Sequence, residues 1–234
     1  AAHLKRMSRG LKVLKLASPK SLSTIQKNIF QLLKINRLKN ARVRVMLWQK
    51  GAGVHCAIIV EPLQAPTAGQ YSKGFKAMLT NGHRRQTPVP IKSLDYGIFR
   101  KSLQQARAAG FDEALFLNRK GELVEGSRTN IFLVKDNFLL TPSVKSGCLP
   151  GVTRQVVLAA ARRLELRCAA KALNARDLFK ADEAFLTNAL LGIMPLTRLG
   201  QKRIGTGKPG PVTRRLCLGL QEFPRRLGNS TDVG

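Results

Sequence analysis

NRKGELVEGSRTNIFLV, residues 118–134, reads as two short apolar strands joined by a polar turn that contains glycine. Apolar residues recur at alternate positions around the turn, at Leu115, Leu117, Leu123, Ile131 and Leu133. This alternation predicts strands, with the turn at one end of a sheet. The turn carries the acid Glu125, and loops held by rigid strands are where binding groups concentrate. The alternative is a plain hairpin with a solvated carboxylate, and the neighbouring motifs decide between the two.

The charge of the chain is extreme for its size. It has 234 residues, 44% of them hydrophobic, which is enough for one large domain or two small ones. The formal net charge is +28, and Glu61 is the only acid before Asp95. Such a field attracts anions, including phosphorylated cofactors, carboxylate substrates and nucleic acid. Nucleic acid is the disfavoured partner, because aromatic residues do not interleave with the basic ones.

The cysteines and histidines are scattered along the chain, without a Cys-x-x-Cys pair. We therefore predict no metal site and no disulfide framework. Free cysteines are typical of a reducing compartment, so we expect a cytoplasmic protein. No apolar run approaches the roughly 20 residues that span a bilayer, and we expect no membrane partner.

The pattern divides the chain into two domains of mixed α+β class. Two helices, the second over Leu22–Asn36 with Ser21 as its cap, precede an alternating strand over residues 41–49. An apolar run predicts a more fully buried strand over residues 54–60. The predicted boundaries are a small N-terminal domain over 1–63, a linker over 64–70, a large domain over 71–223 and a flexible tail over 224–234.

Two further sites in the large domain could carry chemistry. Lys92 follows apolar residues and proline, and Ser93 is predicted to cap a helix that ends near Ala109. Partial desolvation at this position would favour a neutral, nucleophilic amine, although a solvated lysine is the alternative. In LPGVTR, residues 149–154, glycine allows a ligand close to the backbone and a helix begins whose free N–H groups suit a phosphate. An ordinary helix start is the alternative.

A lysine for a Schiff base, a helix N-terminus for a phosphate and a carboxylate for a ring nitrogen are the parts of a pyridoxal phosphate site. Four motifs carry these parts in order: IKSLDY, EGSRTNIF, TPSVKSGCLPGVTR and DEAFLTNALLGIMPL. In these motifs the chain, up to about Arg215, resembles the class IV aminotransferases. The family includes branched-chain and D-amino-acid transaminases and aminodeoxychorismate lyase. The resemblance implies a pyridoxal phosphate enzyme with the two-domain D-amino-acid-aminotransferase-like fold, and a homodimer.

The resemblance also implies roles for the residues that match the motifs of the family. Lys92 would be the catalytic Schiff-base lysine, and Glu125 would pair with the pyridine nitrogen. The remaining cofactor contacts would be Val152, Thr153 and Arg6 on the phosphate, Asn188 and Ala189 in a turn that touches phosphate and substrate, and Tyr96 on the ring hydroxyl. Substrate contacts are implied at Arg44, Lys50 and Leu190, and no metal is implied.

The chain departs from the family pattern at several points. Family members carry further strands before the motif that Arg6 matches, so we expect the small domain to be incomplete and the chain to be N-terminally truncated. Ala189 lacks the hydroxyl of the usual Gly-Thr-Ala turn, so one side-chain contact to the phosphate is lost. Lys50 keeps the charge of an arginine but loses its bidentate fork. Arg44 lies near a substrate-carboxylate position, although strand alternation equally places it in solvent.

The turn FLTNALLGIMPL, residues 185–196, is more similar to aminodeoxychorismate lyase than to the branched-chain enzymes. The resemblance therefore favours a lyase that eliminates pyruvate from aminodeoxychorismate and leaves 4-aminobenzoate for folate synthesis. A branched-chain or D-amino-acid transaminase that uses 2-oxoglutarate is the alternative, since GELVEGSRTNIFLV and LPGVTR fit both. A basic binding protein without enzymatic activity is a third hypothesis.

Overall fold

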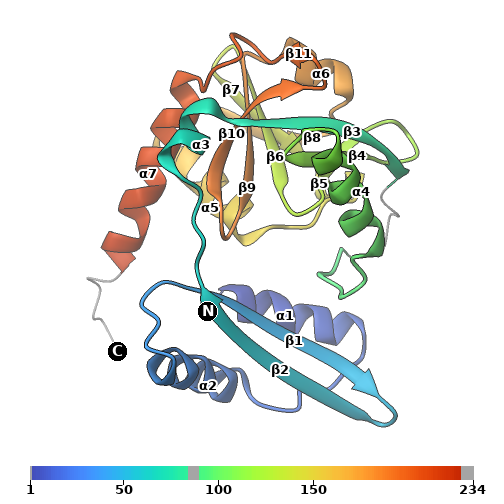
Figure 1. Ribbon diagram of the computed structural model, residues 1–234, viewed down its shortest axis with the longest axis vertical. Helices are drawn as coiled ribbons and strands as arrows, with labels where there is room; N and C mark the ends of the chain where they lie inside the picture. The colour runs from blue at the N-terminus through green and yellow to red at the C-terminus, as the bar shows by residue number, and fades with distance from the viewer. Residues whose placement is uncertain (1, 84–89, 228–234) are drawn as a thin grey trace. The chain divides into compact units, whose positions relative to one another are not determined.

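The computed structural model describes residues 2–83 and 90–227, with the backbone alone at Asn81, His83 and residues 221–227. The chain divides into two compact units (Figure 1). Unit 1 consists of Ala1–Ala65 and Ile91–Asp95, and unit 2 consists of Pro66–Pro90 and the chain from Tyr96 onward. The segment around Lys92 therefore belongs to unit 1, although the sequence places it in the large domain.

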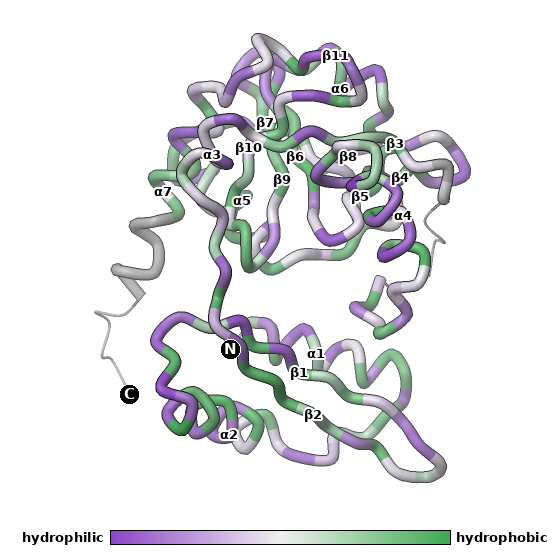
Figure 2. The backbone as a smooth tube through the Cα atoms, in the orientation of Figure 1, coloured by the Kyte–Doolittle hydropathy of each residue, from purple (hydrophilic) through white to green (hydrophobic). Residues whose placement is uncertain are grey.

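Unit 1 pairs two helices with a two-stranded antiparallel sheet. Its elements are α1 (Ala2–Val13), α2 (Leu22–Ile35), β1 (Ala41–Lys50) and β2 (Gly53–Pro62). Hydrophilic and hydrophobic residues alternate along both helices (Figure 2). The predicted cap is confirmed, because the Ser21 hydroxyl accepts the Thr24 N–H at 3.1 Å. The prediction of a more fully buried second strand is wrong. Among the described strands β2 pairs with β1 alone, it has no buried residue, and one face keeps exposed residues such as Ile59.

Unit 2 contains one curled sheet with helices packed on it. Its helical elements are α3 (Ala68–Lys73), α4 (Gly97–Ala108), the 3-10 turn η1 (Val144–Ser146), α5 (Val152–Arg163), α6 (Ala175–Lys180) and α7 (Pro211–Leu227). Its strands are β3 (Phe75–His83), β4 (Glu113–Leu117), β5 (Leu123–Gly126), β6 (Asn130–Lys135), β7 (Phe138–Pro142), β8 (Cys168–Lys171), β9 (Glu183–Asn188), β10 (Gly192–Leu199) and β11 (Lys202–Arg203). Among the described residues, no helix is long and apolar enough to cross a membrane.

The strand order places the two halves of residues 118–134, β5 and β6, on the same curled sheet. Within the described residues the order is β5-β4-β3-β10-β9-β6-β7-β8, with β11 paired to β10. The strand β3 is parallel to β4 and β10, and β7 is parallel to β8, whereas the other pairs are antiparallel. The strand β5 also contacts β6, although it stands at the end of this order. The sheet therefore brings β5, which carries Glu125, close to β6 and β9.

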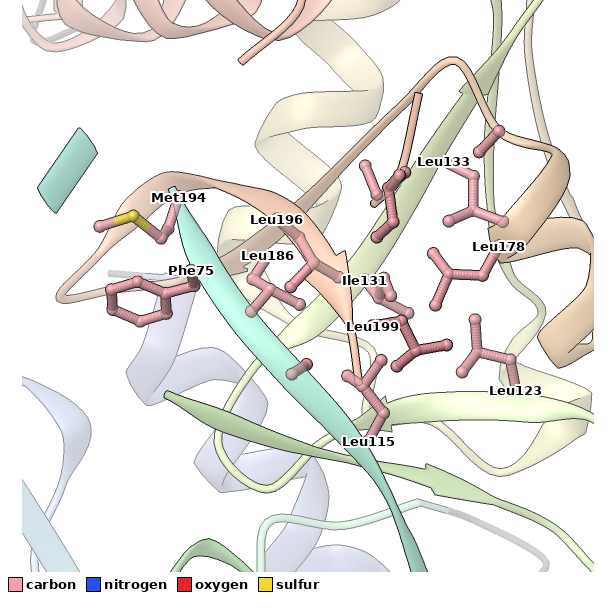
Figure 3. Packing of buried hydrophobic residues seen from close by; sticks show 14 of the residues in the cluster. Phe75, Leu115, Leu123, Ile131, Leu133, Leu178, Leu186, Met194, Leu196 and Leu199 are labelled. Atoms are coloured by element: carbon pink, nitrogen blue, oxygen red, sulfur yellow. The ribbon is translucent and has the colours of Figure 1, made fainter. Parts of the chain in front are cut away.

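The sheet is buried on both faces. Along β6, Ile131 and Leu133 enter one apolar cluster, which also contains Leu123 from β5 (Figure 3). The alternate residues Phe132 and Val134 enter a second cluster with residues of α5 and α7. Strands covered on both sides leave the turn at their end firmly held. The strands β5 and β6 therefore belong to the core of unit 2.

Three element boundaries differ from those predicted. The helix α4 begins at Gly97 rather than after Ser93, because Ile91–Asp95 packs with unit 1; Gly110, in the left-handed region with φ +80°, follows its end. Residues 68–70 of the predicted linker are helical, because Thr67 and Gln70 form a capping box at the start of α3. Residues 224–227 of the predicted tail continue α7, and residues 228–234 lie outside the described part of the chain.

Candidate active site

Glu125, the acid predicted to lie in the turn, is buried within β5. Glu125 is 6% exposed. Its Oε2 accepts the Leu149 N–H at 2.9 Å and lies 3.4 Å from Nδ2 of Asn130. Burying a carboxylate without hydrogen bonds is costly, so these donors hold its charge in place. The solvated carboxylate is therefore excluded, and Glu125 is attached to the loop that leads into α5.

Asn130, at the start of β6, connects that loop to the carboxylate. Its Nδ2 donates to the Leu149 carbonyl at 2.9 Å. Its Oδ1 occupies the space beside Gly151, where an added Cβ would lie only 2.0 Å away. The glycine is thus required for close packing at this point. The sequence analysis missed Asn130, whose role depends on contacts with residues about twenty positions away.

The N-terminus of α5 has the features of an anion site. The N-cap residue is Gly151, and no side chain among the described residues caps the helix. Val152 and Thr153 are the first helical residues and are half-buried. Uncapped N–H groups and the helix dipole favour a phosphate at this end. The buried Arg154 donates to the Pro142 carbonyl at 2.9 Å and to Thr141 at 3.3 Å, so its guanidinium anchors α5 to β7.

The turn after β9 is fixed by the side chain of Asn188, the last residue of that strand. Oδ1 of Asn188 accepts the N–H groups of Leu190 and Leu191, each at 2.8 Å, and Nδ2 donates to the Arg128 carbonyl at 3.2 Å. Ala189 and Leu190 are exposed on this turn. Because Thr187 pairs with Asn130 across β9 and β6, the turn lies next to the start of β6. Within unit 2, the structure brings Glu125, the start of α5 and the Asn188 turn together.

A second buried carboxylate holds the turn between β5 and β6. Glu113 is 1% exposed and accepts the Ser127 N–H at 3.0 Å, the Ser127 hydroxyl, and the Thr129 hydroxyl at 2.9 Å. A Cβ on Gly126 would lie 2.2 Å from that Thr129 hydroxyl oxygen. The sequence analysis missed Glu113. The sequence signal is an acid at the start of an apolar strand, with two hydroxyl residues in the turn after the following strand.

Unit 1 carries two of the predicted cofactor residues, Arg6 and Lys92. Arg6 is half-buried in α1, and Lys92 follows Ile91, whose Cγ2 would lie 3.9 Å from a Cβ on Gly10. The pKa of His3 is lowered by loss of solvation and then by the positive charges of Arg6 and Lys92, so both cations act on the same part of this unit. The Lys92 residue is exposed, and its role as an activated amine stays a prediction.

The remaining predicted residues are also divided between the units. Tyr96 is the N-cap of α4 in unit 2, 38% exposed, with its ring 6.4 Å from that of Phe99. Arg44 and Lys50 are exposed on β1 in unit 1, where Arg44 lies opposite Ile59. The assembly of the unit 1 residues and the unit 2 residues into one site stays a prediction.

Gly151→Ala is expected to destabilise unit 2 by about 1–3 kcal/mol, the usual cost of overpacking a filled site. The added methyl would meet Oδ1 of Asn130, and moving this side chain breaks its bonds to Leu149 and Glu125. Urea unfolding measures the change. The control is Gly69→Ala in α3, where the nearest atom to the new methyl is 3.8 Å away. Equal stability of the two variants would contradict the packing described for Gly151.

Comparison with known proteins identifies the family and the fold. The model of the amino-transferase class IV family matches residues 1–199. A relative from Methanocaldococcus jannaschii, described as a candidate branched-chain-amino-acid aminotransferase, is 30% identical over 97% of this chain and 82% of its own length.

Two solved structures have the same fold. The Escherichia coli branched-chain amino acid aminotransferase matches with a TM-score of 0.89 and 24% identity, over 95% of this chain and 78% of its own. A candidate 4-amino-4-deoxychorismate lyase from Legionella pneumophila matches with a TM-score of 0.85 and 22% identity, over 94% of this chain and 84% of its own. The predicted mixed α/β fold is confirmed. The chain belongs to the amino-transferase class IV family, a family of enzymes.

Proposed function

We propose that this protein is a pyridoxal-phosphate-dependent transaminase of branched-chain amino acids. The observation that carries the proposal is the link between Glu125 and α5. The buried carboxylate is hydrogen-bonded to Leu149, two residues before the N-cap of a helix with no side-chain cap. A negative charge and an anion-binding helix end are thereby held at a fixed separation.

These groups fit the two ends of the cofactor. The α5 N-terminus suits a phosphate through its N–H groups and dipole. The Glu125 carboxylate suits a protonated pyridine nitrogen, because an opposite charge stabilises the protonated form. Asn130 contacts both the Glu125 carboxylate and the α5 loop, and so fixes their spacing. Pyridoxal phosphate, when bound, supplies a ring that takes up the electron pair left at the α-carbon of the substrate.

The residues of the chain would then have the following roles in the reaction. Lys92 would hold the cofactor through its Nζ, and the same Nζ would act as the general base that takes the α-proton of the substrate. Glu125 would stabilise the protonated form of the ring nitrogen. Arg6 adds a second cation to the phosphate, and the Asn188 turn orients the substrate beside it.

The substrate class is supported by the relative from Methanocaldococcus jannaschii, whose description names branched-chain amino acids. Aminodeoxychorismate lyase is the second candidate. The observation that favours it is the turn Asn188–Leu191, which has the lyase-like sequence Asn-Ala-Leu-Leu in place of a Gly-Thr-Ala turn. The Legionella structure adds likeness of fold alone.

A pair of assays on the purified protein tests the proposal. Leucine with 2-oxoglutarate is expected to give 4-methyl-2-oxopentanoate and glutamate. Release of pyruvate and 4-aminobenzoate from aminodeoxychorismate, without transamination, would overturn the transaminase and establish the lyase. Borohydride reduction followed by peptide mass analysis is expected to fix the cofactor onto Lys92. Failure to bind pyridoxal phosphate, together with salt-sensitive binding of nucleic acid, would favour the basic binding protein.

Glu125→Gln is expected to lower kcat at least about 100-fold, the scale on which loss of one preorganised charge contact acts. The glutamine keeps the shape of the side chain and its hydrogen bond to Leu149 but removes the charge. The control is Glu122→Gln, three residues earlier, whose carboxylate accepts only the Asn118 amide among the bonds described here, at 2.7 Å. The same kcat in both variants would contradict the role of Glu125.

A further inference from the structure

We propose that Arg128 binds the second carboxylate of a dicarboxylate substrate. The inference rests on the proposed function and deepens it by assigning the residue that recognises one class of substrate. Arg128 lies in the middle of the turn between β5, which carries Glu125, and β6, which begins at Asn130.

The turn that carries Arg128 is rigid. The Gly126 N–H donates to the Thr129 carbonyl at 2.7 Å, and the Ser127 N–H donates to the Ala114 carbonyl at 2.9 Å. Both neighbours of Arg128 also bond to the carboxylate of Glu113. Because the backbone polar groups on either side are satisfied within the protein, the turn has little freedom to change shape.

The turn presents a single side chain to solvent. Within residues 125–130, all of which the structure describes, Glu125, Ser127, Thr129 and Asn130 are 6%, 7%, 4% and 7% exposed, and Gly126 is buried. Arg128 is exposed. An exposed cationic side chain on a rigid turn is well placed for recognition, because rigid backbone lowers the entropy lost on binding.

The backbone of Arg128 is hydrogen-bonded to the Asn188 turn. Its carbonyl accepts Nδ2 of Asn188 at 3.2 Å, and the same Asn188 side chain fixes the N–H groups of Leu190 and Leu191. Arg128 is therefore placed between Glu125 and the Asn188 turn. The guanidinium of Arg154 is buried and bonded to Pro142 and Thr141, so it anchors α5 to β7.

The chemistry of both candidate reactions calls for such a cation. A guanidinium binds a carboxylate through two parallel hydrogen bonds, which a lysine does not reproduce. The amino acceptor of the transaminase, 2-oxoglutarate, carries a second carboxylate, and so does aminodeoxychorismate. Leucine carries only its α-carboxylate. The second carboxylate distinguishes these two substrates from leucine, and it is this group that we assign to Arg128.

Calorimetric titration of the cofactor-loaded protein with two substrate-like acids tests this assignment. The probes are glutarate, with two carboxylates, and 4-methylpentanoate, with one. For Arg128→Gln we expect the Kd of glutarate to rise at least about 10-fold, the scale of a charged hydrogen bond, and that of 4-methylpentanoate to change less than about 3-fold. Arg128→Lys is expected to fall between wild type and glutamine for glutarate.

The control is Arg119→Gln, an exposed arginine of the same unit whose loss removes the same charge from the basic field. It is expected to leave both Kd values unchanged. An unchanged glutarate Kd in Arg128→Gln, or an equal rise for both acids, would overturn the assignment. Failure of the proposed function is recognised separately, because the wild-type protein would then form no glutamate from leucine and 2-oxoglutarate.

Discussion

Lys92→Ala is expected to abolish measurable turnover of leucine with 2-oxoglutarate. The substitution removes both the covalent attachment point and the group that takes the α-proton. The second role alone is worth about 10²–10⁴-fold in rate. Because the Lys92 side chain is exposed, its loss opens no cavity in the core, and folding is expected to be unaffected. The measurement is kcat of the purified variant, with the circular dichroism spectrum as the check on folding.

Two additions make this experiment specific to Lys92. The matched control is Lys101→Ala, an exposed lysine of α4, which is expected to retain wild-type kcat. A small primary amine added to Lys92→Ala is expected to restore part of the rate, since it supplies the missing base from solution. Wild-type turnover in the purified Lys92→Ala protein would refute the assignment of this lysine.

Features that arise from neighbours along the chain could be predicted from the sequence, whereas features set by tertiary contacts could not. Period-2 alternation predicted the strands around Glu125, and helical spacing predicted α1, α2 and α5, because these patterns arise from neighbours along the chain. The start of α4 was misplaced because Ser93 offers a good cap, yet the tertiary packing of Ile91–Asp95 with unit 1 decides the boundary. The burial of β2 was overestimated because sequence does not reveal how many partners a strand will have.

The same distinction applies to the candidate site. Glu125 and the start of α5 were found because they lie in short motifs with fixed spacing. Glu113 and Asn130 were missed because their roles come from contacts across 14 to 19 positions of sequence. Neither residue lies in a pattern that periodicity detects. They were recognised only when the strands of the curled sheet brought them against the turn.

Glu113→Ala is expected to lower the free energy of unfolding by about 3–5 kcal/mol, the range found when one partner of a buried charged network is removed. The Ser127 N–H, the Ser127 hydroxyl and the Thr129 hydroxyl would lose their acceptor inside the protein. Glu113→Gln keeps one acceptor oxygen and is expected to lose about 1–2 kcal/mol. Urea unfolding measures both variants. The control is Glu165→Gln, an exposed acid, expected within about 0.5 kcal/mol of wild type.

Substitutions of the two buried carboxylates, Glu113 and Glu125, are expected to have different effects on stability and on turnover. Glu113 bonds to the turn from outside the site, so its loss should reduce stability and, through the displaced Arg128, weaken glutarate binding. Glu125→Gln keeps the hydrogen bond to Leu149, so it should reduce turnover with little change in stability. If Glu113→Gln unfolds like wild type and binds glutarate like wild type, Glu113 does not position the turn. The rigidity inferred for Arg128 would then need another source.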